Sequence, residues 1–143
     1  MNLRYLLDPN IISEPLKPKP NPNVSEKLQH HRTESAIATT VWHELWFGCN
    51  RLPSSRRRDA MEYYLLQVVR KTIPFLSCDA DAATWHAQER ARLMALGQTP
   101  PFLDGQIAAI AKTNNLILVT GNASDYQNFT ELQVENWYDN SNK

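Results

Sequence analysis

The chain has 143 residues, a length that favours a single domain spanning residues 1–143. Its 15 basic and 15 acidic side chains cancel, which excludes the strongly basic proteins that bind nucleic acid through net charge alone. Two isolated cysteines give no disulfide framework, and no stretch has the apolar length of a membrane span or signal-peptide core, so we expect a cytoplasmic protein without a membrane segment.

The charges are distributed unevenly along the chain. Residues 1–78 contain eleven Lys and Arg against seven Asp and Glu, whereas residues 79–143 contain four against eight. This asymmetry predicts a basic part that is able to face a phosphate backbone and an acidic part that supplies carboxylates.

The chain begins with an apolar stretch that predicts a strand over residues 3–7, followed directly by the polar turn Asp-Pro-Asn at residues 8–10. A helical turn is expected over residues 11–14. The prolines at 15, 18, 20 and 22 then exclude regular helix. This segment predicts an exposed surface connection, and contact with RNA or a protein partner is the alternative.

A helix and a short strand are expected next. The helix covers about residues 23–32, with Asn23 or Ser25 as its cap. Residues 35–39 have mostly small side chains and are predicted to form a buried strand.

The helix predicted over residues 41–50 carries a carboxylate that helix capping does not explain. Thr39 or Thr40 is expected to cap this helix. Glu44 follows Thr40 by four residues, whereas a capping box needs a spacing of three. Glu44 is therefore a candidate functional residue.

The middle of the chain combines a basic helix with an alanine-rich one. Residues 51–71 begin with an arginine-rich break and continue as a helix, which predicts either a solvated face or contact with phosphate. A weak strand at 73–77 precedes a helix over about residues 79–96, capped by Asp79 or Asp81. Its small side chains predict a close-packing ridge made by Ala83, Ala87, Ala91 and Met94.

The segment Pro100–Tyr126 contains most of the candidate chemistry. A helix is predicted near its start, with Asp104 in the first turn. Its apolar residues recur at helical spacing and are predicted to form a stripe packed on the core: Leu103, Ile107, Ile110 and Ala111. Residues 116–119 form an apolar run typical of a buried parallel strand, and Asn122 and Asp125 lie in the turn after it.

Strands that alternate with helices predict an α/β fold in three layers, α/β/α, around a central and mostly parallel sheet. Residues 132–137 alternate in polarity and suit a last edge strand. Ligands of open α/β sheets bind at the carboxyl ends of the strands. We therefore expect Asp8, Asp104, Asn122 and Asp125 to converge in one cleft.

Carboxylates that share a cleft repel one another unless a cation compensates, so this cluster predicts a divalent metal. Oxygen ligands suit Mg²⁺ or Mn²⁺, and a phosphodiester is the expected substrate because such an ion polarises a phosphoryl oxygen and activates water. Asp8 and Asp104 are the predicted direct ligands. Glu44 would orient a metal-bound water or hold a second ion, and Asn122 and Asp125 would close the site.

Each of these residues also has an ordinary structural explanation. Asp104 alone is favourable at a helix N-terminus, and Asp8 before proline is common in turns. Asp125 would also suit the cap of a short final helix, and Asn122 a left-handed turn conformation. The prediction depends on the joint pattern rather than on any one member.

Four stretches resemble, in order and approximate spacing, the motifs of PIN-domain proteins, and most of all the VapC-type toxins of bacterial toxin–antitoxin pairs. They are L-L-D-P-N-I-I-S-E (6–14), H-E-L-W-F-G (43–48), F-L-D-G-Q-I-A-A-I-A (102–111) and L-V-T-G-N-A-S-D-Y (118–126). The resemblance spans nearly the whole chain. It implies a PIN-like α/β/α fold, a Mg²⁺- or Mn²⁺-dependent endoribonuclease, a cognate antitoxin that inhibits it, and homodimers.

The family's three acidic positions match Asp8, Glu44 and Asp104. The fourth position matches either Asn122 or Asp125, and the sequence leaves this choice open. Two residues depart from the family pattern: Pro9 stands where a threonine is usual, and Gly121 where a basic residue is frequent.

Two other classes of protein are alternatives to the nuclease interpretation. A catalytically weakened PIN-like module that binds RNA or protein would explain Pro9 and Asn122, but it would have no use for Glu44. A phosphoacceptor receiver domain needs paired acids after the first strand, and Lys112 is badly placed as its phosphate-binding lysine. The four glycines form no G-x-G-x-x-G or P-loop pattern, which disfavours a nucleotide cofactor.

Overall fold

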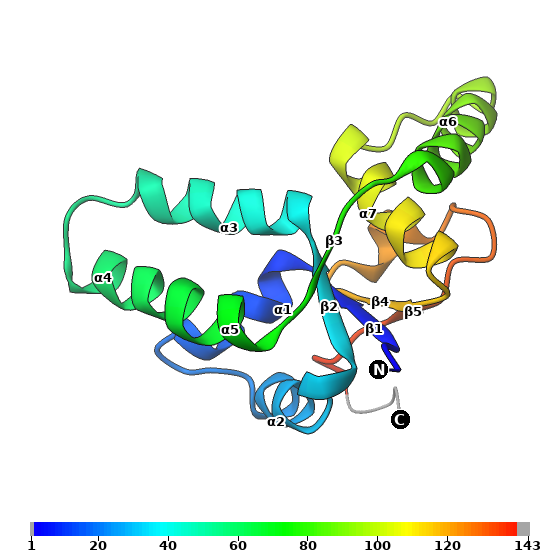
Figure 1. Ribbon diagram of the computed structural model, residues 1–143. Helices are drawn as coiled ribbons and strands as arrows, with labels where there is room; N and C mark the ends of the chain where they lie inside the picture. The colour runs from blue at the N-terminus through cyan, green and yellow to red at the C-terminus, as the bar shows by residue number, and fades with distance from the viewer. Residues whose placement is uncertain (1, 140–143) are drawn as a thin grey trace.

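The computed structural model describes residues 2–139, which form a central sheet of parallel strands flanked by helices (Figure 1). The strands are β1 (Tyr5–Leu7), β2 (Ser35–Ala38), β3 (Phe75–Leu76), β4 (Ile117–Val119) and β5 (Val134–Glu135). Their order in the sheet is β3-β2-β1-β4-β5, and every pairing is parallel. The predicted three-layer α/β/α fold is confirmed, including the edge strand near the end of the chain.

The connections between the strands are mostly helical. The α-helices are α1 (Pro9–Ser13), α2 (Pro22–His30), α3 (Thr39–Arg51), α4 (Arg56–Tyr63), α5 (Arg70–Thr72), α6 (Ala80–Ala95) and α7 (Phe102–Thr113). Short 3₁₀ turns cover Glu14–Leu16, Arg32–Glu34 and Ala123–Tyr126. A π-helical stretch, Tyr64–Val69, joins α4 to α5. Among residues 2–139, no helix combines the length and the apolar character needed to cross a bilayer.

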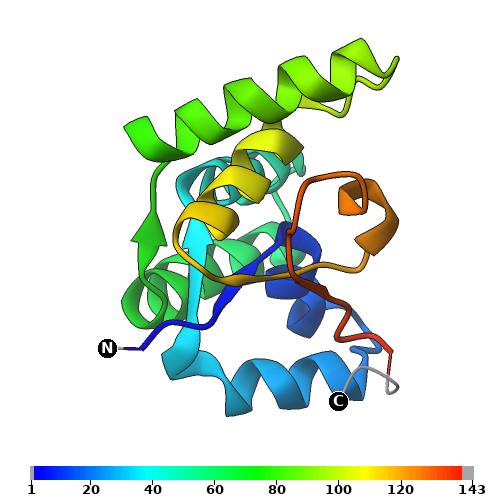
Figure 2. The same ribbon diagram turned by 90° about the vertical axis from the view of Figure 1, so that its right-hand side faces the viewer.

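The sheet separates two groups of helices. In Figure 1, α1 to α5 lie on one side of it and α6 and α7 on the other, and Figure 2 shows α6 and α7 together, far from α2. Right-handed connections explain this division, because the chain steps from β1 outward to β3 and then returns across the sheet to β4. The strand order therefore reverses between β1 and β4, and a cleft is expected outside their carboxyl ends.

The strands are apolar because both faces of the sheet are covered. Leu6, Leu7, Ile37 and Leu118 have no exposed surface. Trp137, just after β5, is also fully buried, and its ring lies edge-on to Tyr5 of β1, with the ring centres 5.2 Å apart. The C-terminal stretch is therefore part of the core.

Helix α7 sits unusually close to α6 at one glycine. A Cβ atom added at Gly105 would overlap the imidazole ring of His86, which is itself almost fully buried. Only a glycine allows this approach, which fixes the first turn of α7 and with it the neighbouring Asp104. Leu103 was predicted to face the core from this turn, but its side chain is exposed.

The predicted close-packing ridge on α6 is wrong. The helix begins as expected, because Asp79 Oδ1 accepts a hydrogen bond from the Ala82 amide at 2.9 Å. Its buried face, however, consists of Ala82, His86, Glu89 and Leu93. The predicted ridge faces solvent at Ala83, Ala87, Ala91 and Met94. The sequence pattern missed the true face because that face contains two polar residues, which are buried with specific partners.

Two predicted helix caps are also wrong. Asn21, rather than Asn23 or Ser25, caps α2, and its Oδ1 accepts a hydrogen bond from the Asn23 amide at 2.9 Å. Pro22 takes the first helical position, where a missing N–H has no cost, so the helix starts earlier than predicted. Helix α3 begins at Thr39 itself, and no side chain caps it.

The buried carboxylate of Glu89 connects α6 to the loop that precedes β5. Its oxygens accept hydrogen bonds from the Thr130 amide at 2.7 Å and the Thr130 hydroxyl at 3.0 Å. Arg92 donates two more, from Nε at 3.0 Å and Nη2 at 2.9 Å. These hydrogen bonds, led by those of Arg92, lower the pKa of Glu89 to about 2.

Replacement of Glu89 by alanine should destabilise the fold by about 2 kcal/mol, because the Thr130 amide loses its partner. The matched control is Glu62→Ala, which removes a partly exposed ion pair with Arg58 and should cost about 1 kcal/mol or less. Urea unfolding at pH 7 measures both. Because the Glu89 pKa is depressed, its contribution should disappear as the pH falls from about 4.5 towards 2. Equal losses for the two variants would contradict this role.

Candidate active site

An open pocket of about 240 Å³ lies beyond the carboxyl ends of β1 and β4. It is lined by Asp8, Pro9, Asn10, Glu44, Asp104, Asn122, Asp125 and Tyr126. The five residues singled out from the sequence therefore all line one pocket. They come from the turn after β1, from α3, from the start of α7 and from the segment after β4, so the tertiary fold alone brings them together.

Helix capping does not account for these acids. Asp8 occupies the cap position of α1, but its side chain makes no capping hydrogen bond. Asp104 lies in the first turn of α7 as predicted, and no side chain caps that helix. Asp125 lies within the 3₁₀ turn Ala123–Tyr126 and does not cap it. Neither Asp8 nor Asp104 is therefore used in a helix-capping hydrogen bond.

Thr120 ties the end of β4 to Asp8. Its hydroxyl donates a hydrogen bond to Asp8 Oδ2 at 2.7 Å and accepts one from the Asn122 amide at 3.0 Å. The Asp8 amide also donates to the carbonyl of Val119 at 2.9 Å. One oxygen of Asp8 is thus held in a fixed direction, and the segment carrying Asn122 is fixed by the same hydroxyl.

The pocket contains uncompensated negative charge. Burial raises the pKa of Asp8 to about 6, the Thr120 hydrogen bond opposes this, and Asp104, Glu44 and Asp125 add to the rise. Burial and Asp104 raise the pKa of Glu44. Burial and Asp125 raise that of Asp104. Such mutual repulsion indicates a site that a cation would stabilise.

The donor atoms fit a hard divalent cation. Asn10 Oδ1 is a buried oxygen in this pocket, without a hydrogen-bond partner in the described part of the chain. No three Asp, Glu, His or Cys side chains among residues 2–139 are arranged to bind one ion together. Mg²⁺ keeps several waters and is commonly bound by one or two carboxylates, so Asp8 and Asp104 with Asn10 nearby suit it.

Three residues of the site were not predicted from the sequence. Asn10 and Thr120 occur in the matched stretches, but no role was assigned to them. Tyr126 is buried and lines the pocket, and the interaction of its hydroxyl with Asp104 opposes the rise in the pKa of that carboxyl, which burial and Asp125 cause. A threonine at the end of a buried strand, two residues before Asn122, was the available signal for Thr120.

Gly121 has a steric reason in this chain. A Cβ atom there would lie 2.8 Å from the Tyr138 ring and 3.2 Å from the side-chain nitrogen of Asn10. The Tyr138 hydroxyl donates a hydrogen bond to Glu14 Oε1 at 2.6 Å. The basic residue frequent at this position in the family would therefore collide with the ring of Tyr138.

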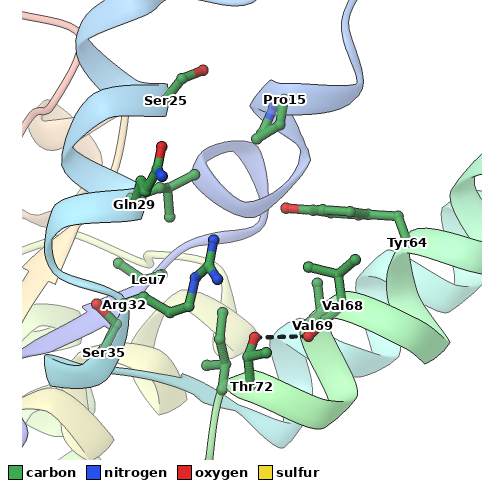
Figure 3. A pocket seen from close by; sticks show the side chains of 12 residues that line it. Leu7, Pro15, Ser25, Gln29, Arg32, Ser35, Tyr64, Val68, Val69 and Thr72 are labelled. Carbon is green, nitrogen blue, oxygen red and sulfur yellow. Dashed lines mark hydrogen bonds between the residues drawn. The ribbon is translucent and has the colours of Figure 1, made fainter.

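A second pocket, of about 250 Å³, has a different chemistry (Figure 3). It lies between α2, Pro15 and the continuous helical segment formed by the π-helical stretch Tyr64–Val69 and α5. Its lining is largely apolar. Figure 3 shows Arg32 extending into it, and within residues 2–139 this is the one charged side chain of its lining. Without a carboxylate among its described lining residues, this pocket offers no site for a hard cation.

The fold and the acidic pocket define a PIN domain, and the chain belongs to that family: residues 5–129 match its model. Over 135 residues the chain is 30% identical to the tRNA(fMet)-specific endonuclease VapC of Shigella flexneri, an alignment that covers 94% of this chain and 98% of that protein. It is 29% identical over 140 residues to Toxin FitB of Neisseria gonorrhoeae, and this alignment covers 94% of this chain and 99% of FitB.

A solved structure, that of FitAcB from Neisseria gonorrhoeae, has the same architecture. The TM-score is 0.85 at 28% identity, and the match covers 94% of this chain and 98% of the other. The family resemblance recognised in the sequence is confirmed by these comparisons.

Asp8→Asn should stabilise the metal-free protein above pH 6 by on the order of 2 kcal/mol, because about two pKa units separate the folded carboxyl from its ordinary value of 3.8. The asparagine Oδ1 keeps the acceptor for Thr120. A raised carboxyl pKa means that wild-type stability falls as the pH rises from about 4 to 6, so the difference should vanish below pH 4.

Thermal melting in EDTA at pH 8 and pH 3.5 measures the effect of Asp8→Asn. The exposed Asp81, on α6, provides the matched control, and Asp81→Asn should leave the melting temperature nearly unchanged at both values. Identical melting of the Asp8→Asn and wild-type proteins at pH 8 would show that the buried charge does not oppose folding.

Proposed function

We propose that this protein is a metal-dependent endoribonuclease and the toxin of a toxin–antitoxin pair. The observation that carries the proposal is the convergence of four carboxylates, from Asp8, Glu44, Asp104 and Asp125, in one pocket at the point where the strand order reverses. Relatives named as an endonuclease and as a toxin align with almost the full length of the chain.

Asp8 and Asp104 would hold Mg²⁺ or Mn²⁺. The bound ion would polarise the phosphoryl oxygen, lower the pKa of the attacking water and offset charge on the leaving oxygen. Thr120 and Tyr126 orient the two carboxylates through hydrogen bonds, so the ligand oxygens are fixed before the substrate arrives. Glu44, with a raised pKa beside Asp104, would orient the water and accept its proton.

Asp125 is the better candidate for the fourth position. Its charge raises the pKa of both Asp104 and Asp8, so it acts on the carboxylates that would bind the ion. Asn122 lines the same pocket, and its backbone amide is used in the hydrogen bond to Thr120. We therefore propose that Asn122 lines the site without contributing charge, and that Asp125 provides the fourth carboxylate.

The partners follow from the same proposal. The substrate is RNA, which is cut at a phosphodiester bond in the acidic pocket. A cognate antitoxin would inhibit the enzyme by placing a segment in or near this pocket, and the protein would act as a homodimer in the cytoplasm. These statements rest on the family resemblance and on the chemistry of the pocket.

Asp104→Asn should reduce RNA cleavage at least about 100-fold, because it removes a metal ligand while keeping its size and its hydrogen bond to Tyr126. The purified protein, freed of antitoxin, is assayed on labelled RNA with Mg²⁺ or Mn²⁺, and EDTA should stop the reaction. Asp81→Asn is the control and should retain full activity. Cleavage that persists in folded Asp104→Asn protein refutes the assignment.

Glu44→Gln separates the nuclease from a weakened binding module. The change keeps the shape and removes the charge, so single-turnover cleavage should fall by about 10²- to 10⁴-fold while RNA affinity stays within about twofold. Filter binding and single-turnover kinetics on the same RNA measure both. A binding module predicts wild-type protein that binds RNA without cutting it, and a Glu44→Gln variant that is indistinguishable from it.

A further inference from the structure

The outward face of α3 carries three side chains that neither the core nor the acidic pocket uses. His43, Phe47 and Arg51 are spaced by four residues, so they lie in one row along the helix. We call this row the α3 ridge. Phe47 is 54% exposed, the His43 and Phe47 rings are nearly parallel with centres 6.2 Å apart, and Arg51 Cζ lies 5.0 Å from the centre of the Phe47 ring.

The α3 ridge begins where the acidic pocket ends. Glu44, which lines the pocket, precedes Phe47 by three residues, so the two are neighbours on the helix, about 4.5 Å apart along its axis. Arg51 follows one turn further from the pocket. Across a short loop, α4 begins with the exposed Arg56 and Arg57. Along α3 the side chains therefore change from the carboxylate of Glu44 to aromatic rings and then to the cation of Arg51, and the chain continues to two further exposed arginines.

The cationic part of this surface is free to meet an anion. Within residues 2–139, Arg51 forms no ion pair, and its guanidinium is held over the exposed ring of Phe47. A single exposed phenylalanine needs no explanation. An exposed ring that lies between a histidine and an unpaired arginine, one turn from the acids, is a suitable surface for a flat ligand with an attached anion.

We propose that the α3 ridge binds single-stranded RNA beside the bond that is cut, which rests on the proposed function. One nucleobase stacks on the His43 and Phe47 rings, and Arg51, with Arg56 and Arg57 beyond it, binds the adjoining phosphates. Stacking tolerates any base because every base has a π-face, whereas the arginines give salt-dependent affinity. The ridge thus positions the strand, and the acidic pocket cuts it.

Binding of a fluorescein-labelled single-stranded RNA of mixed sequence, followed by anisotropy in EDTA, tests the stacking. Phe47→Ala and Phe47→Leu should both weaken binding by about 5- to 100-fold, because leucine keeps the bulk but not the π-face. Phe47→Trp should bind within about twofold of wild type. The matched control is Tyr63→Ala on α4, where the ring is 67% exposed and no change is expected.

The arginine is tested through the salt dependence of the same binding. Arg51→Gln should reduce the slope of log affinity against log salt by about 0.7, the value for one contact with a single-stranded phosphate. Its control is Arg70→Gln, because Arg70 also lies over a ring, that of Phe75, at 5.5 Å. In cleavage assays with metal, Phe47→Ala should raise KM and leave kcat nearly unchanged.

The outcomes distinguish this inference from the proposed function. If wild-type protein cleaves RNA and the Phe47→Ala and Tyr63→Ala variants bind it equally well, the α3 ridge does not bind RNA although the nuclease assignment stands. If Phe47→Ala changes the molar mass in light scattering and leaves RNA affinity unchanged, the ridge is a protein contact and the proposal is wrong. If wild-type protein neither binds nor cleaves RNA, both proposals fail.

Discussion

The hydrogen bond from Thr120 to Asp8 joins the ends of two strands that are far apart in the chain but adjacent in the sheet. It exists because β4 returns across the sheet to pair with β1, which places two polar turns side by side. Asp104 and Glu44 reach the same pocket only because α7 and α3 approach this edge from opposite faces of the sheet. The whole site therefore depends on one parallel pairing.

The site works against the stability of the fold that forms it. Asp8 is almost fully buried near three other carboxylates, and its pKa is raised to about 6 as a result. Glu89, equally buried, has a pKa near 2 because Arg92 and Thr130 satisfy it. Glu89 is a buried carboxylate whose charge is balanced by Arg92, whereas the charge of Asp8 has no cation beside it among the described residues and would be stabilised by a bound one.

The sequence was sufficient to predict the sheet, its edge strand and the meeting of the acids, since these follow from apolar runs and from residues at strand ends. It failed on α6, where the buried face includes His86 and Glu89, because periodicity counts apolar side chains and cannot detect polar ones that gain partners in the fold. It also missed the cap by Asn21 and the role of Thr120. Both depend on hydrogen-bond geometry rather than on residue type.

The position of Tyr138 affects how truncated versions of this chain should be interpreted. The match to the family ends at residue 129, yet the Tyr138 ring lies against Gly121, next to the pocket residue Asn122, and its hydroxyl donates a hydrogen bond to Glu14. Trp137 beside it fills the core. A truncation made at the family boundary would keep every acid in the chain but remove β5 and the buried Trp137, so inactivity of such a fragment would report a damaged fold rather than a failure of catalysis.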